Sequence, residues 1–92
     1  MQIQSISGKF TNASSVLITF KDLVKTGNKV LVVAPKGVNI LFLYDNLGNT
    51  YTQVDHNEWM ATDVLGGRLT VAFQIAGALV TEQEFCIAEV EQ

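Results

Sequence analysis

Charged residues are scarce in this chain. They make up 16% of its 92 residues, against about 25% in an average soluble domain, whereas hydrophobic residues make up 48%. The six Lys and Arg side chains are outnumbered by nine Asp and Glu, and no basic run exists that could neutralise phosphates. This balance excludes a nucleic-acid-binding protein. With so few charges, we expect apolar surface to remain outside the core and to need a partner that covers it.

Cysteine and proline occur once each, as Cys86 and Pro35. A single cysteine cannot form an internal disulfide, which excludes a disulfide-stapled extracellular domain. Cys86 lies among apolar residues, where a buried and unreactive thiol is expected rather than a nucleophile. The stretch 35–37, PKG, is expected to form a tight connection, because proline fixes φ and glycine accepts a positive φ.

No hydrophobic run is long enough to cross a membrane. The most apolar region, residues 30–44, is interrupted by a proline, a lysine, a glycine and an asparagine, whereas a spanning helix needs about 20 continuous apolar residues. The N-terminus reads MQIQSISGKF, without a basic run followed by an apolar block, so no secretory signal is expected. We therefore expect a protein that is made in a host cytoplasm and has no membrane partner.

Short stretches of alternating or β-branched apolar residues recur along the chain. In residues 15–21, Val16 and Ile18 alternate with polar side chains, and residues 68–75 alternate in the same way. Strands are expected at 15–21, 29–34, 38–44, 50–54, 58–62, 68–75 and 85–91. Seven or eight short antiparallel strands predict an all-β fold, a single small β-sandwich of jelly-roll or immunoglobulin-like type over residues 1–92.

The C-terminal segment, residues 75–92, leaves an alternative open. Residues 76–85, AGALVTEQEF, are rich in Ala, Leu, Glu and Gln, which favour a helix. Phe85, Ile87 and Val90 favour a strand instead. A strand is the favoured interpretation, with a partial helix as the alternative.

The stretch Tyr44–Thr52, YDNLGNTYT, combines acidic and amide side chains with a glycine. A calcium loop places oxygen ligands at alternating positions and usually ends in a carboxylate. This stretch has no such carboxylate, and a leucine lies in its middle. Asp and Asn side chains can instead bond back to the backbone, and glycine can adopt a positive φ in a turn between paired strands. We expect a structural hairpin turn, with no metal, formed by Asp45, Asn46, Gly48 and Asn49.

A second polar stretch, VDHNEW, places Asp55, His56 and Glu58 together. A metal site normally needs three or more ligands with supporting contacts, and the chain has no second histidine. Cys86 and His56 lack a third, orienting group for a nucleophile–base pair. We expect a solvated loop here, no catalytic residue and no cofactor, and a protein that is not an enzyme.

Four stretches in fixed order, GNKVLVVA, YDNLGNTYT, EWMATDVLGGRLTVAF and CIAEVE, resemble a β-sandwich domain that recurs in bacterial surface proteins and bacteriophage structural proteins. The resemblance covers Ser15–Glu91 and implies the fold, while the functions of that family are diverse. The family usually carries long loops. Here they are shortened to PKG and DVLGG, which removes most of the surface that generally carries ligand sites.

The strand before the motif also departs from the family. Relatives commonly have small polar residues at positions where this chain has Leu41, Phe42 and Tyr44. Because side chains alternate along a strand, Phe42 and Tyr44 are expected on one face, with Leu41 and Leu43 on the other. One face would pack on the core and the other would contact a partner. Phe42 and Tyr44 are therefore the candidate interface residues.

A small sandwich with few loops, few charges and an apolar outer strand suits a non-enzymatic structural protein. We expect a bacteriophage capsid decoration (cement) protein, located on the capsid surface of a virion, which stabilises the shell by protein–protein contacts. The expected partners are a capsid or other virion protein and further copies of the chain in a dimer or trimer. One alternative is a tail or fibre accessory module. Another is a carbohydrate-binding module, in which Tyr44, Tyr51 and Trp59 would stack on a glycan, although a lone tryptophan in so small a sandwich is more often core.

Overall fold

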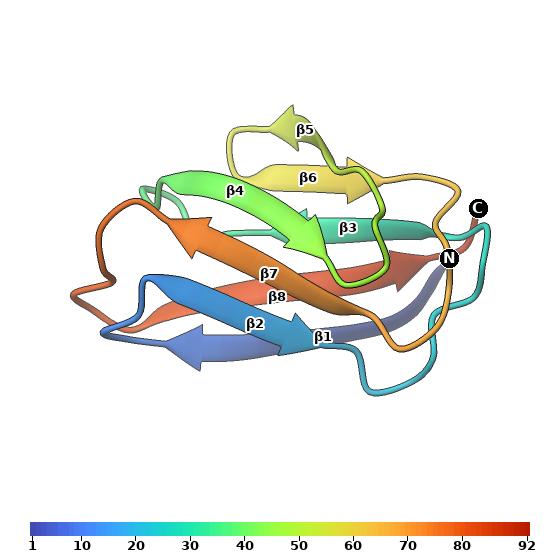
Figure 1. Ribbon diagram of the computed structural model, residues 1–92, viewed down its shortest axis with the longest axis horizontal. Helices are drawn as coiled ribbons and strands as arrows, with labels where there is room; N and C mark the ends of the chain where they lie inside the picture. Colours follow the sequence, from blue (N-terminus) through green and yellow to red (C-terminus); the bar gives the residue numbers. More distant parts are fainter.

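Eight β-strands and no helix make up the computed structural model, which describes all 92 residues. The strands are β1 (Gln2–Phe10), β2 (Ser15–Thr19), β3 (Lys29–Val33), β4 (Ile40–Asp45), β5 (Thr52–Asp55), β6 (Glu58–Ala61), β7 (Thr70–Ile75) and β8 (Gln83–Val90). They form a five-stranded sheet in the order β1-β8-β3-β6-β5 and a three-stranded sheet in the order β2-β7-β4, packed in two layers (Figure 1). The expected all-β sandwich is confirmed.

The strand pairs are nested. β1 pairs with β8, β2 with β7 and β3 with β6, all antiparallel, as in one long hairpin that is folded over on itself. This nesting is the jelly-roll arrangement rather than the immunoglobulin-like one. The chain changes sheet at every connection except the one between β5 and β6. Both termini lie at the same end of the sandwich (Figure 1).

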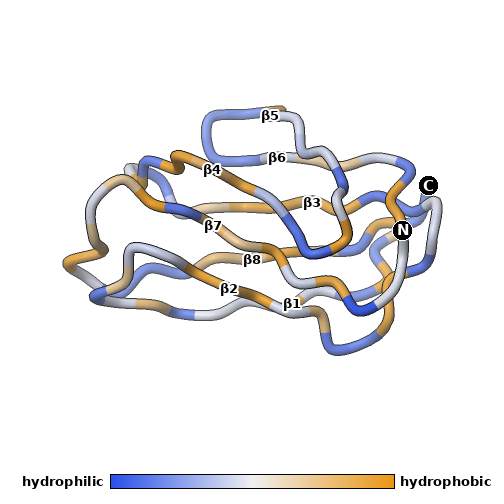
Figure 2. Tube along the Cα trace, viewed as in Figure 1, coloured by the Kyte–Doolittle hydropathy of each residue, from blue (hydrophilic) through white to orange (hydrophobic).

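The core lies between the two sheets and follows the alternation of the strands. The inward side chains of β7 are fully or nearly buried, as are those of β2 and β3. Phe73 packs against Phe85 with ring centroids 4.9 Å apart, and Phe10 meets Phe85 edge-on at 5.9 Å. Because these rings belong to β7, β8 and β1, they join the two layers. Figure 2 shows the apolar stretches along the facing strands and hydrophilic residues at the β5–β6 connection.

Strand β1 is absent from the strands that the sequence predicts. Its segment contains serines, glutamines and a glycine, which give a weak β signal. It nevertheless pairs with β8 from Gln2 opposite Val90 to Phe10 opposite Gln83. Ile6 and Phe10 pack against the core from this strand. Pairing with a central strand supplies the stability that the local sequence lacks.

The helical alternative for residues 75–92 is wrong. Residues 76–82 form a connection, and β8 follows as an interior strand that is bonded to β1 on one side and β3 on the other. Phe85 and Ile87 are completely buried. Burial against the opposite sheet and two bonded neighbours outweigh the helix propensity of the preceding residues.

One carboxylate is buried at the end of β8. Glu89 is 1% exposed. Its Oε1 accepts a hydrogen bond from Gln4 Nε2 at 2.8 Å, and its Oε2 accepts bonds from the Lys25 backbone N at 2.9 Å and Asn28 Nδ2 at 2.8 Å. Burial raises the pKa of Glu89, but the three hydrogen bonds outweigh burial and hold the pKa below its ordinary value. The carboxylate thereby joins β1, β8 and the β2–β3 connection.

Candidate functional site

The YDNLGNTYT motif is organised around the carboxylate of Asp45, at the end of β4. Asp45 is buried. Its Oδ1 accepts hydrogen bonds from the backbone N of Leu47 at 2.9 Å and of Asn49 at 3.1 Å. Its Oδ2 accepts bonds from Asn49 Nδ2 at 3.0 Å and from Tyr51 Oη at 2.8 Å. Four donors occupy the acceptor capacity of the two oxygens, which leaves no free oxygen for a cation.

The two asparagines of the motif bind the connection between β6 and β7. Asn46 Nδ2 donates to the Arg68 carbonyl at 2.8 Å, and its Oδ1 accepts from the Thr70 backbone N at 2.7 Å. Asn49 makes the same two-way contact with Leu65, donating to its carbonyl and accepting from its backbone N. Each side-chain amide thus donates to and accepts from the backbone of this segment, as the backbone of a neighbouring strand would. The motif is a structural clamp.

The expected turn is present, but it is not a hairpin. Gly48 has φ of 83°, the positive value that the sequence predicts. However, β4 pairs with β7 in one sheet and β5 pairs with β6 in the other. The residues after Asp45 therefore form an arch between the layers. The hydrogen bond from Tyr51 Oη to the buried Asp45 carboxylate holds the two ends of this arch together. Burial raises the pKa of Tyr51 far above its ordinary value, with the hydrogen bond to Asp45 adding to the effect, so the phenol stays a donor.

The outer face of the three-stranded sheet carries large exposed apolar side chains. Phe42 is 66% exposed, Tyr44 55% and Leu17 63%. Leu17 on β2 and Tyr44 on β4 both pair with Ala72 of β7, so the three residues form one row across the sheet. Ala72 is only 4% exposed, although it points outward, because its larger neighbours flank it. The structure thus places both candidate interface residues, Phe42 and Tyr44, on the outer face.

Leu41 was expected to share a face with Leu43, and this expectation is wrong. The register of β4 against β7 shifts between Ile40 and Phe42, where a β-bulge inserts one extra residue. Leu43 packs against the core, whereas Leu41 is 55% exposed. Leu17 was not singled out from the sequence. It could have been found there, because it occupies the outward position between two inward residues of an alternating strand.

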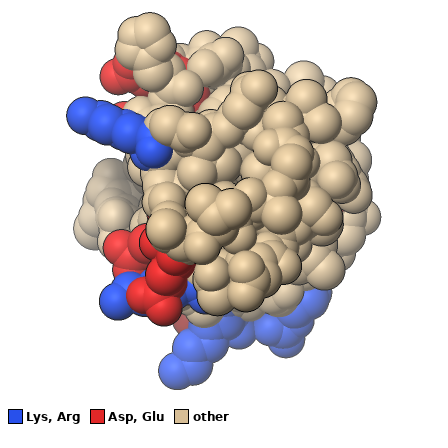
Figure 3. Space-filling view, turned by 90° about the vertical axis from the view of Figure 1, so that its left-hand side faces the viewer, with Lys and Arg blue, Asp and Glu red and all other residues tan.

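No charged side chain lies on this outer face. Among the residues of β2, β4 and β7 the one charged residue is Asp45, which is buried. In Figure 3, which looks at the end of the sandwich, Lys, Arg, Asp and Glu gather along one side and at the bottom, and a broad continuous area has none. We call the outer side chains of β2, β4 and β7 the neutral face. At one end of the face Thr19 and Thr70 share a hydrogen bond of 2.8 Å. Lys21 and Arg68 follow just beyond the strands, where Arg68 Nη1 donates to the Lys21 carbonyl.

The three aromatic residues considered for stacking on sugars do not share a surface. Tyr44 lies on the neutral face. Tyr51 is bonded to Asp45 and packs against the core, and Trp59 also packs against the core, from β6. Trp59 is half-buried, and its partner across the sheet is the buried Val32. No aromatic platform is formed.

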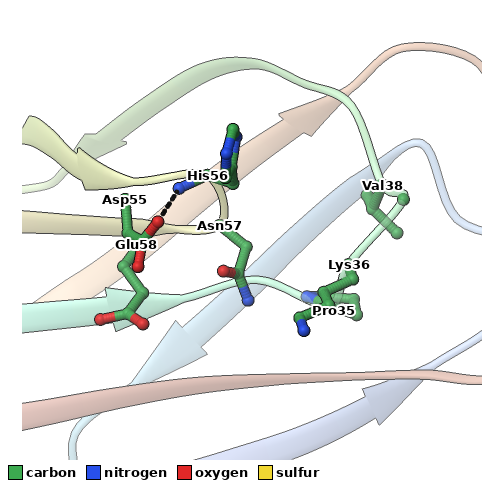
Figure 4. A pocket seen from close by; sticks show the side chains of 8 residues that line it. Pro35, Lys36, Val38, Asp55, His56, Asn57 and Glu58 are labelled. Carbon is green, nitrogen blue, oxygen red and sulfur yellow. Dashed lines mark hydrogen bonds between the residues drawn. The ribbon is translucent and has the colours of Figure 1, made fainter.

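The polar stretch Asp55–Glu58 lines an open depression of about 560 Å³, facing residues 35–38. His56 and Asn57 make the tight turn of the β5–β6 hairpin, where the His56 backbone N donates to Asp55 Oδ1 at 2.8 Å. Figure 4 shows the two carboxylates side by side, with the imidazole directed away from them. No group of three or more His, Cys, Asp or Glu side chains is close enough to hold a metal ion. The depression offers two carboxylates and no third ligand.

Cys86 lies on the outer side of β8, between Ser7 of β1 and Val33 of β3. It is half-buried rather than fully buried. Partial burial and then the charge of Glu84 raise the pKa of the thiol. Because the thiolate is the reactive form, both effects make Cys86 less reactive. His56 lies on the β5–β6 turn and does not contact it.

Comparison of the chain with protein-family models, curated proteins and solved structures found no match. The family resemblance of the four sequence stretches therefore stays a prediction. The structure contains no helix that could cross a membrane.

Proposed function

We propose that this chain is a non-enzymatic structural protein of a virion, acting as a decoration (cement) protein of a bacteriophage capsid. The neutral face is the observation that carries the proposal. Phe42, Tyr44 and Leu17 are each more than half exposed there, and no charge accompanies them. A protein with such a face stabilises an assembly by burying area against a neighbouring protein.

The polar side chains of the chain support a structural role as well. Asp45, Asn46 and Asn49 use their hydrogen-bonding groups to hold the arch and the β6–β7 connection together. Glu89 is fully bonded inside the core. The apolar surface that remains for an external partner includes Leu17, Phe42 and Tyr44 of the neutral face. Protein–protein contact is the function that this distribution supports best.

The assignment to a phage shell rests on two further points. The sequence resembles a domain found in bacteriophage structural proteins. In addition, the connections between sheets are short: the shortest spans residues 11–14 and the longest residues 20–28. A brick-like domain of 36 × 23 × 22 Å without long loops can pack closely between neighbouring shell subunits.

The test is binding to assembled capsids of the virus that encodes the chain, prepared without this protein. The purified protein should cosediment with them, saturate at a fixed ratio to the shell subunit, and raise the temperature at which the shell opens. A glycan array serves as the parallel arm for the carbohydrate alternative. Absence of cosedimentation under conditions in which the protein is folded would refute the proposal.

A further inference from the structure

The neutral face is not flat, and its relief repeats across the sheet. The central strand β7 presents small or slender outward side chains, Thr70, Ala72 and Gln74, whereas the flanking strands present Leu17 on one side and Phe42 with Tyr44 on the other. Ala72 is 4% exposed and its two neighbours in the row are more than half exposed. The face therefore has a furrow along β7 between a low ridge on β2 and a high aromatic ridge on β4.

The width of the furrow suits an aromatic side chain. The two ridges stand two strand spacings apart, roughly 10 Å. The aromatic ridge of β4 on a second copy of the chain can enter the furrow of the first, while the ridge of the first enters the furrow of the second. A twofold axis that lies in the interface, parallel to the strands and between β4 and β7, relates the two insertions, so the contact is isologous. The two sheets then lie face to face at the spacing of about 10 Å that is usual for packed sheets.

The absence of charge favours a second copy over a foreign partner. In an isologous contact the residues near the axis meet their own counterparts, so a charge near the axis would meet a like charge. The strands of the neutral face expose none. Specific contacts between different proteins commonly use complementary charges to select the partner. The neutral face has no such means of selection, while the net charge of −3 lies elsewhere on the molecule.

The area is sufficient for a reversible dimer. The two exposed aromatics and two exposed leucines of the face offer roughly 450–500 Å² per copy, judged from the 150–250 Å² that a buried aromatic covers. With the surrounding Thr, Ser and Gln side chains, a symmetric pair buries about 1,000–1,200 Å² in total, the lower limit for a specific interface.

We infer that the neutral face binds a second copy of this chain, with the Phe42–Tyr44 ridge of each copy in the furrow over Ala72 of the other. This inference rests on the proposed function, because it names the partner of the same face. A decoration protein that is paired in this way presents two identical remaining surfaces to the shell. One dimer can therefore bridge two neighbouring shell subunits, and the two contacts reinforce each other.

Sedimentation velocity over 1–200 µM tests the pairing, with variants from both ridges. The native chain should form a reversible dimer with Kd on the order of 1–10 µM, in the weak range of interfaces near the lower size limit. Phe42→Ser and Leu17→Ser should each weaken it at least 30-fold, while Leu65→Ser, which removes a side chain of similar exposure from the β6–β7 connection, should leave it unchanged. Circular dichroism confirms that each variant is folded.

Three results would overturn the inference. One is a native chain that stays monomeric at 200 µM. Another is a dimer that Leu65→Ser disrupts as strongly as Phe42→Ser. The third is a dimer lost in Phe42→Ser and intact in Leu17→Ser, which indicates pairing along the free edge of β4. Cosedimentation with capsids separates the two proposals. A monomer that binds capsids refutes the pairing alone, and a dimer of this geometry that ignores capsids refutes the capsid role alone.

Discussion

Replacement of Glu89 by glutamine changes one atom of a buried cluster and should cost a large part of the stability of the domain. The carboxylate accepts three hydrogen bonds, from Gln4, Lys25 and Asn28, and donates none. A glutamine amide must turn its NH₂ group toward one of these donors. The Lys25 backbone N cannot turn away, and Gln4 is itself bonded to both the N and the O of Asp22. One bond to a charged group is lost and a donor is left without an acceptor, so the free energy of unfolding should fall by about 2–3 kcal/mol at pH 7.

The effect should depend on pH in a defined direction. The folded-state pKa of Glu89 lies below its ordinary value of 4.5. A group with a lowered folded pKa stabilises the protein above its unfolded pKa, and that stabilisation is lost as the pH falls through the folded pKa. Protonated Glu89 carries a donor of its own and resembles glutamine. The stabilities of native chain and Glu89→Gln should therefore differ at pH 7 and converge in acid.

Urea unfolding monitored by circular dichroism between pH 7 and about 3 measures this convergence. In thermal unfolding at pH 7, the melting temperature of Glu89→Gln should lie about 10–20 °C below that of the native chain, given 4–8 °C per kcal/mol for a domain of this size. Glu84→Gln is the matched control, because it removes an exposed carboxylate from the same strand. A stability difference that is independent of pH, or one no larger than that of the control, would refute the assignment of a bonded, ionised carboxylate.

Three further predictions concern the motif, the glycines and the tryptophan. Asp45→Asn should lower the free energy of unfolding by about 2–3 kcal/mol, because its NH₂ group would face the donors of Asn49 or Tyr51. Calcium or a chelator should leave the melting temperature of the native chain unchanged. A calcium-dependent rise of several degrees in the melting temperature contradicts the structural role of the motif. Gly66→Ala should cost about 3 kcal/mol or more, because a Cβ there would collide with the backbone O of Val24 and N of Thr26. Gly48→Ala, with open space but φ of 83°, should cost only about 1 kcal/mol, so equal costs in denaturant titrations would be inconsistent with the structure. Trp59→Ala should destabilise the fold by about 2–4 kcal/mol. No glycan should change the fluorescence of Trp59 in the native chain. If a sugar quenches this fluorescence while the protein stays folded, the carbohydrate-binding alternative is supported.

The strands that could be predicted from the sequence are those in which alternation and burial agree. In β2 and β7 the inward residues Val16, Ile18, Val71 and Phe73 are all buried, as the pattern indicates. The β1 strand could not be predicted, because its stability comes from pairing with β8, which lies about eighty residues away in the sequence. The sandwich itself was predicted, but the strand order within its two sheets was not, for a related reason. Strand signals reveal neither which strands pair nor where the chain crosses between layers.

The candidate site was predicted in some of its residues, without Leu17, and only partly in its geometry. Phe42 and Tyr44 are exposed as expected, and the turn at Gly48 has the expected backbone conformation. The motif looked like a hairpin because Asp, Asn and Gly between two strands are typical of one. The difference lies in Asp45, whose carboxylate is buried with four donors. Local sequence does not reveal that such a residue points into the sandwich rather than into solvent.

The buried Asp45 and the exposed aromatic ridge are consequences of one constraint on β4. Ile40 and Asp45 both lie opposite inward residues of β7, Ile75 and Val71 respectively. Five residue steps separate the two positions on β4 and four separate their partners, so strict alternation cannot direct both inward. One extra residue resolves the conflict, and the β-bulge at Leu41 supplies it. The bulge turns Phe42 outward beside Tyr44 and leaves Leu41 exposed as well. The motif around Asp45, through which the chain passes from one sheet to the other, therefore also determines which apolar side chains the neutral face presents.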